Sequence, residues 1–120
     1  MKLENTKAQM RKGILELCVL SIVSRKEAYP SDIINELKNS KLIVVEGTLY
    51  PLLTRLKNAE LLSYNWKESK SGPPRKYYSI TDKGEDFRQG LQSTWEELYH
   101  AVNASAMIKK ATKRTKASPK

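Results

Sequence analysis

The segment 47–58 carries polar side chains whose types and spacing suit the reading of DNA bases. Thr54 and Asn58 are four residues apart, one turn of an α-helix, and Arg55 lies beside them. The major groove of B-form DNA admits a helix, and hydroxyl, amide and guanidinium groups reach base edges there. Solvated helix faces carry the same groups, so RNA or a protein remains an alternative partner on this pattern alone.

The segment 70–76 adds a second group of cations. Lys70, Arg75 and Lys76 flank Gly72 and two prolines. A stiff basic loop of this kind suits contact with phosphates or with an adjacent minor groove.

Residues that could support catalysis or hold a metal are sparse. His100 is the single histidine, and Cys18, the single cysteine, lies in the most apolar stretch, where a buried inert thiol is expected. Glu96 and Glu97 are adjacent, so on a helix they point about 100° apart. Glycine-rich phosphate-binding motifs and nucleophile–base pairs are absent from the sequence. We therefore expect no enzyme, no cofactor and no metal site.

Length and charge narrow the class further. The chain has 120 residues, which fits one domain, and a net charge of +9. Six basic and no acidic residues fall in 109–120, which predicts a disordered basic tail that strengthens binding to any polyanion or only aids solubility. A lone cysteine fits a reducing compartment, and the sequence has neither a signal peptide nor a membrane-length apolar run. These features favour a cytoplasmic protein without membrane contact.

The elements that must position these groups follow from apolar spacing. Helices are predicted over 10–24, 32–38 and about 47–59, and two strands at 62–66 and 75–80 joined by a turn at 69–74. The third helix has an inward stripe at Leu49, Leu52, Leu53 and Leu56. Three helices followed by a hairpin predict a mainly α fold, the winged helix-turn-helix, over 1–81.

The first and last helices carry more apolar surface than one chain can bury. The first is apolar on nearly every side. The last, predicted over 82–108 and capped by Thr81 or Asp82, is about 40 Å long, whereas the compact part of such a domain is about 26 Å across. We therefore expect a homodimer, with the last helix as its dimerisation helix. Its interface is predicted to include Ile14, Cys18, Phe87, Leu91, Trp95, Leu98 and Val102.

Two longer motifs are more specific. The stretch from Gly47 to Leu56, GTLYPLLTRL, and the stretch from Gly72 to Gly84, GPPRKYYSITDKG, together resemble the PadR family of bacterial transcriptional regulators. The likeness runs over residues 10–105. It implies winged-helix subunits that dimerise through the C-terminal helix and bind palindromic double-stranded DNA operators, usually as repressors. Many such regulators release DNA on binding a phenolic or lipophilic compound.

The resemblance also implies residue roles. It places Gly47, Thr48, Tyr50, Pro51 and Thr54 on the recognition helix, Gly72, Pro73, Arg75 and Lys76 on the wing, and Tyr78 and Thr81 at the junction between the wing and the last helix. Together with the basic and polar pattern, the predicted DNA-binding residues are Gly47, Thr48, Tyr50, Pro51, Thr54, Arg55, Lys57, Asn58, Lys70, Gly72, Arg75 and Lys76.

Glu60 departs from the family pattern, which usually has glycine before the first wing strand. Either Glu60 adopts a left-handed backbone conformation at a cost of about 1 kcal/mol, or the helix ends differently and the wing tilts. Trp95 resembles a residue that lines a pore between the subunits in a drug-binding branch of the family. An effector could bind at Trp95 and Tyr99, or Trp95 could simply pack the dimer core.

Two functions are consistent with these features of the sequence. The first is a homodimeric DNA-binding repressor, in which the aromatic residues Tyr64, Trp66, Tyr77 and Tyr78 serve strand packing. The second is a basic winged-helix module that docks an acidic protein and does not read DNA sequence.

Overall fold

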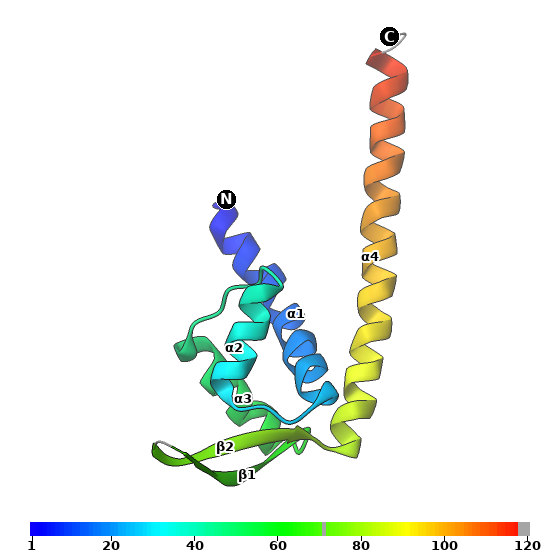
Figure 1. Cartoon of the computed structure of the whole chain (residues 1–120). Coiled ribbons are helices and arrows are strands. Elements are labelled where there is room, and N and C mark those ends of the chain that lie inside the picture. Colours follow the sequence, from blue (N-terminus) through cyan, green and yellow to red (C-terminus); the bar gives the residue numbers. More distant parts are fainter. Residues whose placement is uncertain (71, 118–120) are drawn as a thin grey trace. The chain divides into compact units, whose positions relative to one another are not determined.

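The residues that the computed structural model describes form four helices and one antiparallel hairpin, in the order predicted (Figure 1). The structure describes residues 1–70 and 72–117, with side chains up to Met107. The elements are α1 (Leu3–Arg25), α2 (Pro30–Asn39), α3 (Glu46–Asn58), β1 (Leu62–Ser69), β2 (Gly72–Ile80) and α4 (Asp82–Ala117). The chain divides into two compact units, Met1–Gln89 and Gly90–Lys120, and each is described by itself.

The core of the first unit lies where α1, α2, α3 and β1 meet. Its fully buried side chains are Val19, Leu20, Val23, Ile33, Leu37, Leu49, Leu53 and Leu62. The inward leucine stripe of α3 is thus confirmed, whereas Ile34 of α2 is only half-buried. Each fully buried Leu or Ile contributes about 1.5–3 kcal/mol, so these side chains hold α3 in place.

Helix α1 begins earlier than predicted, at Leu3 rather than near Met10, because residues 3–12 are mostly strong helix formers. Its inner face buries Leu15, Leu17, Val19, Leu20 and Val23. Ile14, Cys18 and Ile22 form a row that stays half-buried. The chain therefore does not cover this helix on every side.

Helices α2 and α3 end in the same backbone motif. Leu61 N–H donates to the Leu56 carbonyl and Glu60 N–H to the Lys57 carbonyl, each at 2.9 Å, and Glu60 has φ 64°. This is a Schellman ending, in which a left-handed residue satisfies the last carbonyls of the helix. Lys41 does the same at the end of α2, with φ 69°. Of the two alternatives for Glu60, the left-handed conformation is the one found, at a cost of about 1 kcal/mol.

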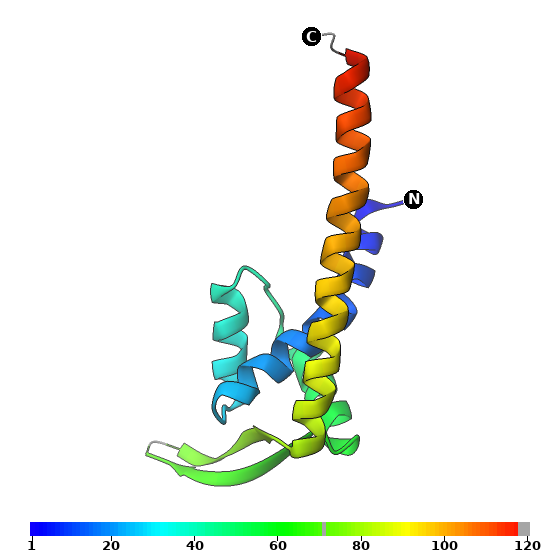
Figure 2. The same cartoon turned by 90° about the vertical axis from the view of Figure 1, so that its right-hand side faces the viewer.

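The hairpin of β1 and β2, which we call the wing, lies below α1 and α2 in both views (Figure 1 and Figure 2). Its strands extend further than predicted, since Ser69 pairs with Gly72. The predicted turn at 69–74 was therefore too wide, because Ser69 and residues 72–74 belong to the strands. A register shift between Lys67 and Ser69 lies opposite Pro73 and Pro74, which have no N–H to donate to a regular ladder.

Thr81 caps α4, as one of the two predicted alternatives. Its hydroxyl accepts a hydrogen bond from Gly84 N–H at 2.9 Å. The Glu85 carboxylate, one turn into α4, accepts hydrogen bonds from the side chains of Ser24 and Arg88.

In the second unit, α4 continues past its predicted end at Ile108 to Ala117. Residues 104–117 are mostly Ala, Lys, Arg and Met, which have high helix propensity. Residues 109–117 are thus helical rather than disordered as predicted, and the remainder of the predicted tail, 118–120, lies outside the described residues.

Candidate nucleic-acid interface

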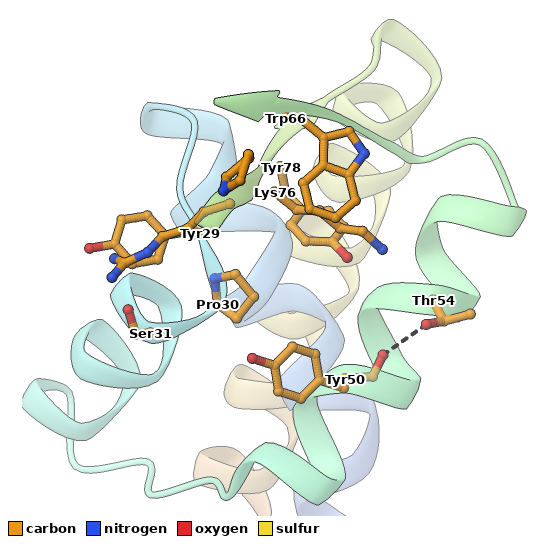
Figure 3. A pocket seen from close by; sticks show the side chains of 10 residues that line it. Tyr29, Pro30, Ser31, Tyr50, Thr54, Trp66, Lys76 and Tyr78 are labelled. Atoms are coloured by element: carbon orange, nitrogen blue, oxygen red, sulfur yellow. Dashed lines mark hydrogen bonds between the residues drawn. The ribbon is translucent and has the colours of Figure 1, made fainter. Parts of the chain in front are cut away.

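The outward face of α3 is fully exposed. Gly47, Pro51, Thr54 and Asn58 follow the centre of this face, opposite the buried leucines. Tyr50 is 45% exposed, and its ring extends from α3 toward the start of α2 (Figure 3). The leucine stripe fixes one side of the helix and leaves a narrow polar ridge of small side chains on the other, as groove entry requires.

Tyr50 and Thr54 are joined within this face. The Thr54 hydroxyl donates a hydrogen bond to the Tyr50 carbonyl oxygen at 3.1 Å (Figure 3). Pro51, in the second turn of α3, has no N–H for the usual helical hydrogen bond. The Thr54 oxygen can still accept a hydrogen bond from a base edge.

A hollow of about 530 Å³ lies between α3 and the wing. We call it the wing–helix hollow; it is lined by Tyr29, Pro30, Ser31, Tyr50, Thr54, Trp66, Pro74, Arg75, Lys76 and Tyr78. Figure 3 shows Tyr50 and Thr54 on the α3 side, Trp66 and Lys76 on the wing side, and Ser31 at the start of α2. Three elements that are distant in sequence therefore share one open cavity.

Both cations of this hollow rest on aromatic rings. The Arg75 guanidinium lies 4.9 Å from the ring centre of Tyr29, and the Lys76 ammonium lies 4.5 Å from that of Tyr64 and 5.4 Å from that of Trp66. Such contacts orient a cation without neutralising it. No acidic residue lines the hollow, and neither cation forms an ion pair with any residue that the structure describes.

Tyr78 is the buried side chain of the hollow, at 5% exposure. Burial raises the pKa of its phenol, and the neighbouring Tyr64 and Tyr50 phenols raise it further. Its hydroxyl therefore stays neutral near pH 7. The Tyr78 backbone exchanges two hydrogen bonds with Ala28, of 2.7 and 3.1 Å, which fasten the wing to the loop before α2.

The structure does not bring all predicted DNA-binding residues together. The hollow brings together four of them: Tyr50, Thr54, Arg75 and Lys76. The adjoining outward face of α3 carries Gly47 and Pro51. Arg55 turns away to pair with Glu16 of α1 at 3.0 Å. The others lie elsewhere: Thr48 lines a separate hollow beside α1, Lys57 and Asn58 line another below α3, and Lys70 and Gly72 are exposed at the hairpin turn.

Two parts of the hollow's lining were not predicted from the sequence. Trp66, assigned to strand packing, is 62% exposed, so that interpretation is wrong for this residue. Tyr29, Pro30 and Ser31, which precede the helix predicted at 32–38, were not among the predicted site residues. Their presence depends on long-range packing of α2 against the wing, for which the local sequence has no signal.

The residues predicted for dimerisation and effector binding are uncovered in part. Ile14, Cys18 and Leu91 are half-buried, whereas Phe87, Trp95, Leu98 and Val102 are 38–65% exposed. Burial raises the pKa of the Cys18 thiol, so it is a poor nucleophile near pH 7. The rings of Trp95 and Tyr99 lie 5.8 Å apart on α4.

Within the described residues, no three His, Cys, Asp or Glu side chains lie where they could hold one metal ion. No described helix is both long and apolar enough to cross a membrane.

Comparison with known proteins agrees with the geometry. The model of the PadR-like family of transcriptional regulators matches residues 19–90. A PadR-like transcription factor from Bacteroides fragilis is 60% identical, with a TM-score of 0.71, over 83% of this chain and 97% of that one. A PadR-like transcriptional regulator from Bacillus cereus is 38% identical, with a TM-score of 0.73, over 82% and 96%. A PadR family regulator from Eggerthella lenta is 31% identical, with a TM-score of 0.77, over 87% and 91%.

The predicted family, its winged-helix fold and its non-enzymatic role are thereby confirmed, and the chain belongs to the PadR-like family of DNA-binding transcriptional regulators.

Proposed function

We propose that this protein is a homodimeric repressor that binds a palindromic operator in the bacterial cytoplasm. The observation that carries the proposal is the exposed face of α3 beside a hollow with two cations and no acidic lining residue. In this arrangement α3 enters the major groove, where Thr54 contacts a base edge, and the wing supplies phosphate contacts.

The uncovered apolar row of α4 supports dimerisation. Phe87, Leu98 and Val102 expose 44–65% of their surface, which is unfavourable for a lone chain in water. A symmetric partner covers such a row and fixes two α3 helices at one spacing. Half-sites then lie about 34–36 Å apart, one helical turn of DNA. We propose that Ile14 and Cys18 of α1, which the chain leaves half-buried, also contact the partner.

We propose that a planar lipophilic or phenolic effector binds at Trp95 and Tyr99 and lowers operator affinity. The tilted pair of partly exposed rings supports this, since aromatic faces suit stacking on such a ligand. In a Trp66→Phe variant the remaining fluorescence comes from Trp95. Planar apolar compounds are expected to quench it; unchanged emission removes Trp95 from the effector site.

The proposed function is tested by selecting duplexes from a random pool with the full chain. Recovery of an inverted repeat, together with a dimer by sedimentation, is the expected result. Failure to enrich any motif indicates the alternative, a basic module that docks an acidic protein. A folded monomer at micromolar concentration contradicts the dimer.

A further inference from the structure

Trp66 is the large side chain of the wing that the fold itself leaves unused. Its ring is 62% exposed, and it lies beside Tyr64 edge-on at 6.2 Å. On the paired strand, Lys76 stands directly opposite Trp66. An aromatic ring so exposed contributes little to the core and is free to contact a partner.

The surroundings of Trp66 identify the chemistry of its partner. Arg75 and Lys76 make the wing–helix hollow cationic, so its occupant is anionic. The exposed rings of Trp66 and Tyr50 also require an apolar part in that occupant. A strand of DNA has both features, because negative phosphates alternate with the apolar edges of deoxyribose.

The position of the hollow identifies which DNA segment this is. Tyr50 and Thr54 line the hollow and also lie on the outward half of α3. A duplex that receives α3 in its major groove therefore carries one backbone strand past the hollow. The exposed Ser31 at the start of α2 adds a hydroxyl that can donate a hydrogen bond to a phosphate.

We infer that the wing–helix hollow seats one sugar–phosphate strand of the bound duplex, with the Trp66 ring against deoxyribose and Arg75 and Lys76 on the flanking phosphates. The inference rests on the proposed function and extends it to residues outside base reading. Trp66 thus strengthens binding to every duplex, whatever its sequence, and Thr54 supplies the sequence preference.

The direct test observes the Trp66 indole N–H by NMR in the full ¹⁵N-labelled chain. Trp66→Phe assigns its resonance against that of Trp95. A soluble gadolinium chelate is expected to relax the Trp66 signal strongly in the free protein and at most half as strongly once a duplex is bound. Anisotropy of a fluorescein-labelled duplex verifies the complex in the same sample. A verified complex in which Trp66 stays as accessible as before overturns the inference, while the proposed function stands. Absence of any complex, with selected and random duplexes alike, overturns the proposed function instead.

Affinity measurements give a second, independent readout. Trp66→Ala is expected to weaken binding to selected and random duplexes by the same factor, about tenfold, with an unchanged salt slope. Lys76→Gln is expected to reduce the slope of log Kd against log salt by about one, since one phosphate contact is lost. Asn65→Ala, on the other face of β1, is the matched control. Trp66→Phe guards against a folding artefact, because a smaller ring retains part of the contact. A Trp66→Ala effect confined to the selected duplex, or no larger than that of Asn65→Ala, overturns the inference.

Discussion

The Thr81 hydroxyl donates a hydrogen bond to the Glu60 carbonyl oxygen across 2.7 Å. The same hydroxyl accepts from Gly84 N–H. One side chain thus connects the end of α3 to the start of α4, with the whole wing between them. The orientation of the reading helix is thereby coupled to the base of the wing.

Glu60→Gly should stabilise the protein. Glycine adopts φ 64° without the Cβ clash, and the gain, offset by its larger unfolded-state entropy, is about 0.5–1 kcal/mol. Ala59→Gly is the matched control, because Ala59 has φ −82° and glycine should destabilise there by a similar amount. Urea unfolding at one fixed protein concentration measures both changes. Equal effects of the two variants would show that the left-handed conformation costs nothing.

Gly84→Ala should be strongly destabilising. A Cβ at this position would lie 2.0 Å from the Leu61 carbonyl oxygen, a backbone atom that cannot move aside alone. We expect a loss of about 2–3 kcal/mol, in the range of overpacked core sites. Gly47→Ala is the contrast, since its Cβ would meet no described atom within 4 Å and alanine favours a helix. Thermal unfolding should therefore move in opposite directions for the two variants.

Glu85 predicts a specific loss of stability in acid. Hydrogen bonds from Arg88 and then Ser24 lower the pKa of its carboxyl from the usual 4.5 to about 2. Because the pKa is lower in the folded state, the stabilisation is present above about pH 4.5 and is lost as pH falls towards 2. Glu85→Gln should flatten the dependence of unfolding free energy on pH in that window alone. An unaltered pH profile would exclude Glu85 as the group responsible.

Thr54→Ala should separate base reading from general affinity. If its hydroxyl contacts a base edge, the variant loses about tenfold or more on a selected duplex and little on random DNA. Removing residues 109–120, with their six basic side chains, should weaken both alike and reduce the salt slope. Gel-shift titrations at two salt concentrations distinguish these cases. If Thr54→Ala binds both duplexes with wild-type affinity, residues of α3 other than Thr54 contact the bases.

Arg55 and Glu16 test whether the ion pair withholds a cation from DNA. The pair is exposed, so Glu16→Gln should change stability by no more than about 1 kcal/mol. Once released, Arg55 can reach a phosphate, and affinity at low salt should rise. Arg55→Ala should reduce the salt slope by about one if it contacts phosphate in the complex. If the wild type, Glu16→Gln and Arg55→Ala have the same slope of log Kd against log salt, Arg55 contacts α1 and not DNA.

The elements were predictable where a local pattern suffices. Four leucines at three- and four-residue spacing define α3, because each must face the same core. The first part of α1, from Leu3 onward, was not predicted. Its polar residues have high helix propensity but little apolar periodicity.

The site was predictable only in part, because a hollow is a long-range property. Arg75 and Lys76 stand out as cations in any reading of the chain. That Arg75 rests on Tyr29 depends on the packing of α2 beside the wing. The exposure of Trp66 was unpredictable for the same reason. Alternation in a strand predicts on which face of the sheet a side chain lies, but not whether another element covers that face.

The backbone pair between Ala28 and Tyr78 has a consequence for how DNA is chosen. It fastens the wing to the helices near its base, so the gap between wing and α3 is set before any duplex arrives. A duplex must then match that gap in groove width and curvature, or bend to do so at an energetic cost that varies with its base steps. Bases that no side chain touches thereby influence affinity through the stiffness of the double helix.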